Sequence, residues 1–163
     1  MYKLFRSPLL VLFTFAILHL QAQDSKEGQQ AKQSQILSLL ESKHYMFVAQ
    51  QVLPLSEGAR TLTSPYDVRV MGDTVISYLP YFGRAYSAVI GTTDEGLNFT
   101  SKKSDYEQKT AKKGGWTVSI KPRNQNIVQN MVFLISESGA ASLQVNCRDR
   151  QGISFNGYIQ EIK

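Results

Sequence analysis

The sequence predicts a mainly β protein, an antiparallel β-sandwich or barrel of about 8–10 strands with one N-terminal α-helix. From His44 onward, apolar and polar residues alternate in short runs, as a strand with one buried face requires. Turn-forming residues separate these runs at a spacing of about 8–12 residues, which is typical of antiparallel folds. A chain of 163 residues with 42% hydrophobic and 19% charged side chains fits one folded domain.

The helix is expected near residues 26–42. Residues 23–35 are polar and rich in glutamine, and they read as a tail that leads into the helix, with Asp24 or Ser25 as its cap. Apolar side chains appear only toward its end, at Ile36, Leu37, Leu39 and Leu40. We therefore expect the last two turns to dock on a single antiparallel β domain formed by residues 36–163. The apolar face is too short to favour the alternative, a helix lying on a membrane surface.

The expected strands follow from the alternation, and the expected turns lie between them. Alternation is clearest in Tyr45–Ala49, Tyr66–Val70, Trp116–Ile120, Ala141–Cys147 and Ile153–Ile159. Turn chemistry is found at Met71–Asp73, Thr93–Gly96, Lys113–Gly115, Ser136–Gly139 and Asp149–Gly152. Met131–Ile135 is continuously apolar, which predicts a central strand covered on both faces, with the helix as one candidate cover.

The N-terminus has the pattern of a signal peptide. Lys3 and Arg6 precede an almost wholly apolar run over residues 9–20, and Ala22 stands just before the polar chain begins. We expect residues 1–22 to be a signal peptide cleaved near Ala22, and the protein to be exported to the periplasm or outer cell surface. The run is shorter than the ~20 apolar residues of a spanning helix, which disfavours a retained anchor.

The count of histidine and cysteine limits the chemistry of the exported chain. Without residues 1–22, only His44 and Cys147 remain, whereas a structural zinc site needs about four ligands. We expect no metal and no cofactor, and a single cysteine cannot form an intramolecular disulfide. Cys147 shares its strand face with Leu143 and Val145, so we expect a buried thiol rather than a nucleophile paired with His44.

The best candidate binding segment is Tyr78–Tyr86, which combines aromatic residues with proline, glycine and arginine. Pro80 cannot donate to a ladder, so the preceding strand should end there. One interpretation is a ligand patch in which aromatic faces stack on a sugar or apolar group and the arginine grips an anion. Its members would be Tyr81, Phe82, Arg84 and Tyr86. The other interpretation is a structural corner in which the aromatic rings fill the core.

A strongly basic stretch covers residues 102–123. It holds seven cationic and two acidic side chains, a local net charge of +5. For an exported protein this favours an anionic surface or an envelope protein over nucleic acid as the partner. The lysines proposed for this contact are Lys102, Lys103, Lys109, Lys112 and Lys113. The alternative is that lysines on an edge strand discourage sheet-to-sheet aggregation.

Two further features give weaker hypotheses. Asp105 and Glu107 stand two apart on one expected strand face, as a crude acid–base pair or, more simply, as solvated side chains. Asp73-Thr74-Val75 is similar to an O-glycosylation signal of exported Gram-negative proteins, which makes Thr74 a candidate modification site.

Several motifs resemble a bacterial family known as domain of unknown function 4251. They are Gly72–Asp73, Tyr78–Tyr86, Gly114–Trp116 and Asn146–Gly157, in the order of the family. The resemblance extends from about residue 36 to 162 and departs from the family at Cys147–Arg150, where a plainer polar turn is expected. It implies export by a Gram-negative bacterium and no established activity, so it implies no catalytic residue.

These observations favour a non-enzymatic binding module for a small amphipathic or glycan ligand. An antiparallel barrel of this size can hold such a ligand inside. A structural or accessory component of a cell-envelope assembly is the first alternative. A hydrolase that uses two carboxylates is the second.

Overall fold

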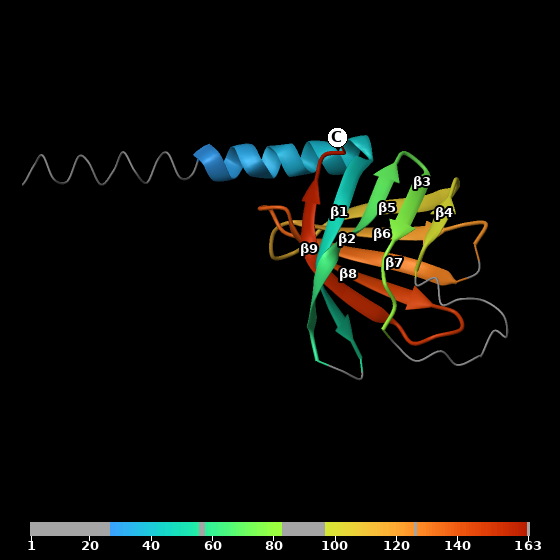
Figure 1. Cartoon of the computed structure of the whole chain (residues 1–163). Helices are drawn as coiled ribbons and strands as arrows, with labels where there is room; N and C mark the ends of the chain where they lie inside the picture. The colour runs from blue at the N-terminus through green and yellow to red at the C-terminus, as the bar shows by residue number, and fades with distance from the viewer. Residues whose placement is uncertain (1–26, 56–57, 83–96, 126, 163) are drawn as a thin grey trace, which may run out of the picture.

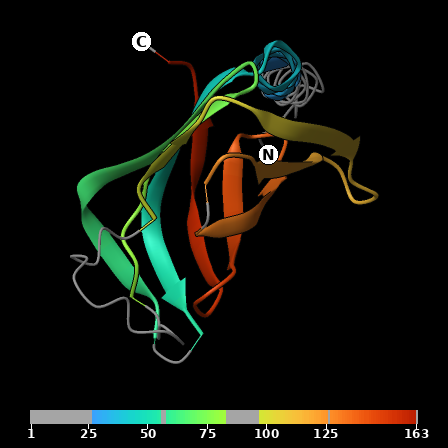
Figure 2. The same cartoon turned by 90° about the vertical axis from the view of Figure 1, so that its right-hand side faces the viewer.

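One antiparallel sheet of nine strands forms the body of the described chain and curls into a nearly closed barrel (Figures 1 and 2). This computed structural model describes residues 27–55, 58–82, 97–125 and 127–162. The strands are β1 His44–Pro54, β2 Arg60–Met71, β3 Thr74–Tyr78, β4 Phe99–Ser101, β5 Ser104–Thr110, β6 Trp116–Pro122, β7 Val128–Ile135, β8 Ala140–Cys147 and β9 Ile153–Gln160. The predicted fold class is confirmed.

The strand order explains how the barrel closes. In space the order is β4-β3-β2-β1-β9-β8-β7-β6-β5, so β9 returns from the far end of the chain to pair with β1. The two strands at the ends of this order, β4 and β5, are consecutive in sequence. Only Lys102 and Lys103 separate them. The two edges of the sheet therefore meet at this short connection.

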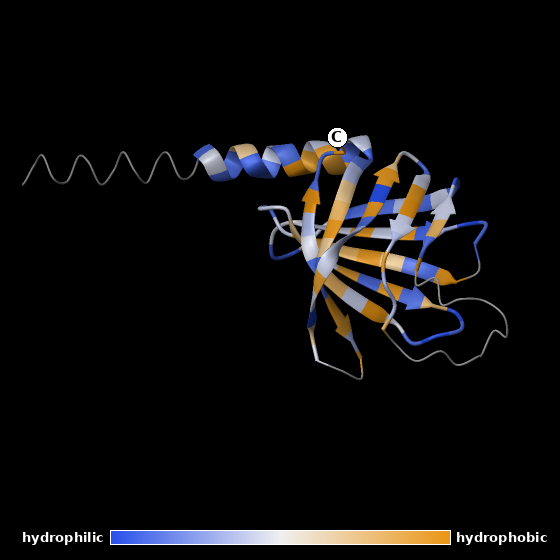
Figure 3. Ribbon diagram, viewed as in Figure 1, coloured by the Kyte–Doolittle hydropathy of each residue, from blue (hydrophilic) through white to orange (hydrophobic). Residues whose placement is uncertain are grey.

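The interior of the barrel is filled by its own side chains. Apolar and polar residues alternate along the strands (Figure 3), and the inward apolar set is buried. Phe47 on β1 and Phe133 on β7 pack edge to face across the interior, with ring centroids 5.6 Å apart at 73°. Tyr45 and Phe155 are also fully buried. This packing leaves the outer surface of the described barrel, rather than the interior that the fold class allowed, as the place for a ligand site.

The helix spans residues 27–42 of the described chain and runs across one end of the barrel (Figure 1). Ile36 and Leu40 are fully buried, whereas residues 27–31 are exposed, which confirms docking by the last two turns. The Tyr106 hydroxyl on β5 donates to the Leu40 carbonyl at 3.1 Å. Gln33 donates to Glu137 at 3.1 Å in the β7–β8 turn, so the helix is tied to two places on the barrel rim.

The turn predictions hold wherever the chain is described. Gly72 and Asp73 form a two-residue hairpin turn between the paired Met71 and Thr74, and Gly72 has a φ of 62° that favours glycine. Turns also connect β5 to β6, β7 to β8 and β8 to β9 at the expected positions. The predicted turn Thr93–Gly96 lies outside the described residues.

The prediction that Met131–Ile135 is covered on both faces is wrong. The segment lies in β7, which has neighbours on both sides, but its burial alternates and Leu134 is 57% exposed. The reason is the position of the helix, which crosses the end of the barrel instead of its outer wall. The outward apolar side chains of β7 therefore remain at the surface.

The predicted signal peptide, residues 1–22, lies outside the described residues. In the part of the chain that the structure describes, the helix is too short and too polar to span a membrane.

Candidate functional site

The end of the barrel opposite the helix brings together the start of β2, the segment after β3 and the β8–β9 turn. β3 ends at Tyr78, as the prediction from Pro80 requires. The structure describes two of the four predicted patch residues, Tyr81 and Phe82. Arg84 and Tyr86 lie outside the described residues.

Tyr81 has the environment of a structural corner. It is 9% exposed, and its hydroxyl donates to the Gln151 carbonyl at 2.9 Å. The Arg150 guanidinium lies 4.9 Å from the centre of its ring, in a cation–π arrangement. Tyr81 therefore ties the chain after β3 to the β8–β9 turn, which favours the structural interpretation at this residue.

Phe82 and Tyr78, by contrast, remain open to solvent. Phe82 is 38% exposed and the Arg60 guanidinium lies 5.5 Å from its ring centre. Tyr78 is 51% exposed and stacks on Tyr66, with ring centroids 5.5 Å apart and planes at 30°. We call Arg60, Tyr66, Tyr78 and Phe82 the aromatic ledge. Each exposed ring has one partner fixing its orientation and still presents surface to a ligand.

Sequence reasoning named Phe82 as a patch residue and included Tyr78 in the candidate segment, but it missed Arg60 and Tyr66. The alternation of side chains along the β2–β3 hairpin gave no signal for the stacked pair of Tyr66 and Tyr78. The two-residue turn at Gly72–Asp73 places Tyr78 opposite Asp67, so Tyr66, one residue earlier in β2, belongs to the other face in a regular sheet. The stacking of the two rings therefore could not be predicted from the hairpin register and is shown only by the structure.

Cys147 is not arranged as a nucleophile. Its side chain is half-buried against the core, and burial raises the pKa of the thiol to about 11, with Arg150 opposing and Asp149 reinforcing the shift. His44 begins β1, whereas Cys147 lies near the barrel end where β1 stops at Pro54. The length of β1, about 30 Å, therefore separates the two side chains.

The raised pKa predicts slow alkylation of Cys147. At pH 8 roughly one thiol in a thousand would be ionised, against roughly a quarter for an ordinary cysteine with a pKa near 8.5. Iodoacetamide labelling of the folded protein, followed by mass spectrometry, should accelerate about tenfold per pH unit up to pH 10. A rate that levels off near pH 8 would contradict the raised pKa of the Cys147 thiol.

The carboxylates Asp105 and Glu107 are solvated ion-pair partners. Both are exposed on β5, and Asp105 lies 2.8 Å from Nη2 of Arg123. Lys109, 2.7 Å from Glu107, lowers the pKa of that carboxyl. A general acid needs a raised pKa at neutral pH, so Glu107 is tuned in the wrong direction for that role. Among the described residues, no group of three His, Cys, Asp or Glu side chains is placed to hold a metal ion.

The basic stretch is divided among several places in the fold. Lys102 and Lys103 lie at the β4–β5 connection, and Lys112 and Lys113 lie in the β5–β6 turn, all exposed. Lys109 is on β5, the last strand in the sheet order, where lysine discourages the addition of another strand. This position is consistent with edge protection and leaves the turn lysines accessible.

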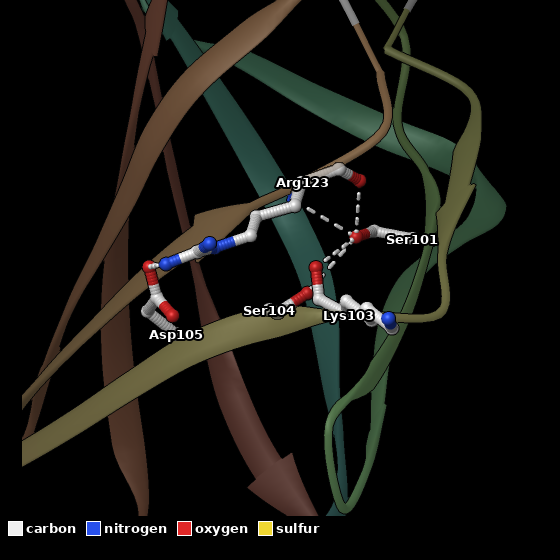
Figure 4. Close-up of polar contacts among 5 residues, drawn as sticks. All are labelled: Ser101, Lys103, Ser104, Asp105 and Arg123. Atoms are coloured by element: carbon white, nitrogen blue, oxygen red, sulfur yellow. Dashed lines mark hydrogen bonds and ion pairs between the residues drawn. The ribbon is translucent and has the colours of Figure 1, made fainter.

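A buried polar cluster joins the two edges of the sheet (Figure 4). The Ser101 hydroxyl on β4 lies 2.8 Å from the Lys103 carbonyl and 2.7 Å from the Arg123 carbonyl. It accepts from the Arg123 backbone N–H at 3.0 Å and from the Ser104 hydroxyl at 3.1 Å. Ser101 is fully buried and Ser104 nearly so. We call this cluster, formed by Ser101, Ser104 and the backbone groups of Lys103 and Arg123, the edge clasp. The burial of both serines indicates a structural role.

Comparison with known proteins identifies relatives by family and by fold. The family model of the domain of unknown function DUF4251 matches residues 27–159. A crystal structure of a DUF4251 family protein from Bacteroides eggerthii is similar with a TM-score of 0.60 and 16% sequence identity, over 82% of this chain and 91% of that chain. No curated protein matches significantly. The family match and the fold shared with the crystal structure agree with the motifs in the sequence. The chain belongs to the DUF4251 family.

Proposed function

We propose that this protein is an exported, non-enzymatic binding module whose ligand is a small amphipathic or glycan molecule held at the aromatic ledge. The observation that carries the proposal is the exposure of Tyr78 and Phe82 together with their stacking on Tyr66 and Arg60. Aromatic faces bind the apolar faces of sugars and lipids, and arginine adds directed hydrogen bonds. Arg84 and Tyr86 follow Phe82 closely in sequence and are proposed to contact the same ligand.

Export is supported by the order of features at the N-terminus. The basic residues Lys3 and Arg6, the apolar run over residues 9–20 and the small residue Ala22 occur in the order that a signal peptidase recognises. N-terminal sequencing of the protein from a periplasmic fraction should begin within about two residues of Gln23. A periplasmic protein that still begins at Met1, or a protein found only in the cytoplasm, would refute export.

The binding function is tested by native mass spectrometry of protein purified from its own periplasm. We expect the wild-type protein to carry a small molecule, and Tyr78→Ala and Phe82→Ala to lose most of it. Leu134→Ala is the matched control, because Leu134 is a large exposed apolar side chain on β7, far from the ledge in the sheet order. A bare wild-type protein, or equal retention by all three variants, would refute the ledge as the binding site.

A second candidate function is an accessory component of an envelope assembly. It is favoured by the exposed lysines on and beside the edge strand β5, which would meet an envelope protein or an anionic surface. The residues proposed for this contact are Lys102, Lys103, Lys109, Lys112 and Lys113. A protein partner or a homodimer in the same mass spectrum would favour this function over the binding module.

A further inference from the structure

A polar groove on the outer wall of the barrel carries charge and hydrogen-bond donors that neither the ledge nor the lysine turns use. It has a volume of about 600 Å³ and lies over strands β6, β7 and β8. Its polar lining consists of Lys121, Arg123, Gln129, Asn130, Asn146 and Arg148. Three of these side chains are cationic, three are amides and none is a carboxylate, which is the composition of a site for an anion.

A bulge in β7 creates the amide part of this groove. Val128 pairs with Cys147 and Asn130 pairs with Asn146, so Gln129 is an extra residue in the strand. Val128 and Met131 are both buried, and the two residues between them consequently face outward together. A regular strand would turn one of them into the core. The bulge thereby places two neighbouring amide side chains on the same outer wall.

The side-chain amide of Asn130 is also held in a defined orientation, by a hydrogen bond from Asn146. Asn146 Nδ2 donates to Asn130 Oδ1 at 2.8 Å, across the β7–β8 pair, and both side chains are half-buried. Since Oδ1 of Asn130 is the acceptor of this bond, the NH₂ group of Asn130 points away from Asn146. The groove therefore offers a fixed donor rather than a freely rotating amide.

The three cationic side chains of the groove differ in how far nearby carboxylates already compensate their charge. Asp105 binds Nε and Nη2 of Arg123, at 3.1 and 2.8 Å. Lys121 lies close enough to Glu107 on β5 to lower the pKa of that carboxyl. Arg148 is exposed and forms no ion pair with any described residue, while its backbone N–H is anchored to the Ile127 carbonyl at 3.1 Å. Arg148 is thus the principal cation left for a ligand.

We propose that this groove binds a phosphate group, with Arg148 as the bidentate anchor and the amide of Asn130 as a neutral donor. A guanidinium beside amide N–H groups matches the geometry of phosphate oxygens, whereas the ammonium groups of the turn lysines offer charge without a fixed hydrogen-bond geometry. The site is separate from the aromatic ledge, which lies on β2, β3 and the chain after β3, so either proposal can fail without the other.

The test is an NMR titration of the ¹⁵N-labelled protein with sodium phosphate at pH 7, against sodium chloride at matched ionic strength. We expect saturable shifts of the side-chain amides of Asn130 and Asn146 with phosphate alone. Arg148→Gln should raise the apparent Kd about tenfold or more, and Lys113→Gln, the same charge change in the β5–β6 turn, should leave it within about twofold. Shifts that chloride reproduces, or equal effects of the two variants, would overturn the proposal.

Two additions complete the test. Lys121→Gln, on the wall of the groove, should weaken phosphate binding more than Lys113→Gln does, which keeps the proposal testable if Arg148→Gln folds poorly. Sedimentation with vesicles of phosphatidylglycerol and phosphatidylcholine then separates two sources of the phosphate. Vesicle binding that Arg148→Gln abolishes and Lys113→Gln preserves assigns a lipid headgroup, and phosphate shifts without vesicle binding assign a soluble phosphate ester. Equal loss in both variants would again count against a built site.

Discussion

Gly157→Ala is expected to lower the free energy of unfolding by about 4 kcal/mol or more, which is most of the stability of a domain at the lower end of the usual range of about 5–15 kcal/mol. A Cβ at this position would lie 1.9 Å from the Val48 carbonyl oxygen and 2.9 Å from its carbon. Both atoms belong to the backbone of β1, so no side-chain rotation can relieve the clash. Gly157 pairs with Ala49 on one side and Ala141 on the other, in the middle of the sheet. The methyl group would force β9 away from β1.

The matched control is Gly28→Ala in the helix. Nothing lies within 4 Å of a Cβ built at Gly28, and alanine favours helix by up to about 1 kcal/mol, so this variant should be neutral or slightly more stable. Urea denaturation followed by circular dichroism measures both variants, and a failure of Gly157→Ala to fold at all fulfils the prediction. A midpoint of Gly157→Ala close to that of the wild type would show that β1 and β9 can separate at little cost.

The strands and turns could be predicted because their determinants are local. Alternation with a period of two predicted the pattern in β8, in which Leu143 and Val145 are buried. The Gly72–Asp73 turn follows from two residues that favour such a hairpin. The helix was also predicted well, since Ile36 and Leu40 lie one turn apart and can reach the same surface.

The features that escaped prediction depend on long-range packing. An apolar run such as that in β7 is compatible with a covered or an exposed outer face. The position of the helix, which is fixed by contacts such as that of Tyr106 with Leu40, determines that the outer face of β7 is exposed. No glycine or proline beside Gln129 indicates the bulge in the sequence. The groove beside it therefore appeared only once β7 and β8 were paired. The stacked pair of Tyr66 and Tyr78 also escaped prediction, because strand alternation assigns these two residues to opposite faces of the sheet.

The edge clasp is the other place where one substitution should have a large effect. Ser101→Ala is expected to lower the free energy of unfolding by about 2 kcal/mol. A hydroxyl carries one proton, so Ser101 donates to one of two carbonyls at a time and accepts from Arg123 and Ser104. Alanine removes the acceptor of the Ser104 hydroxyl and the donor to both carbonyls, in a place with no access to water.

This loss should be concentrated where the sheet closes. β4 pairs along its length only with β3 in the described sheet, and Ser101 connects it to the end of β6. Hydrogen exchange in Ser101→Ala should therefore accelerate most in β4 and least in the central pair β1–β9. Thr100→Ala is the matched control, because Thr100 is exposed on the same strand and should change stability by less than about 0.5 kcal/mol. If Ser101→Ala behaves like Thr100→Ala in both measurements, then the β4–β5 connection and the core close the barrel without the clasp.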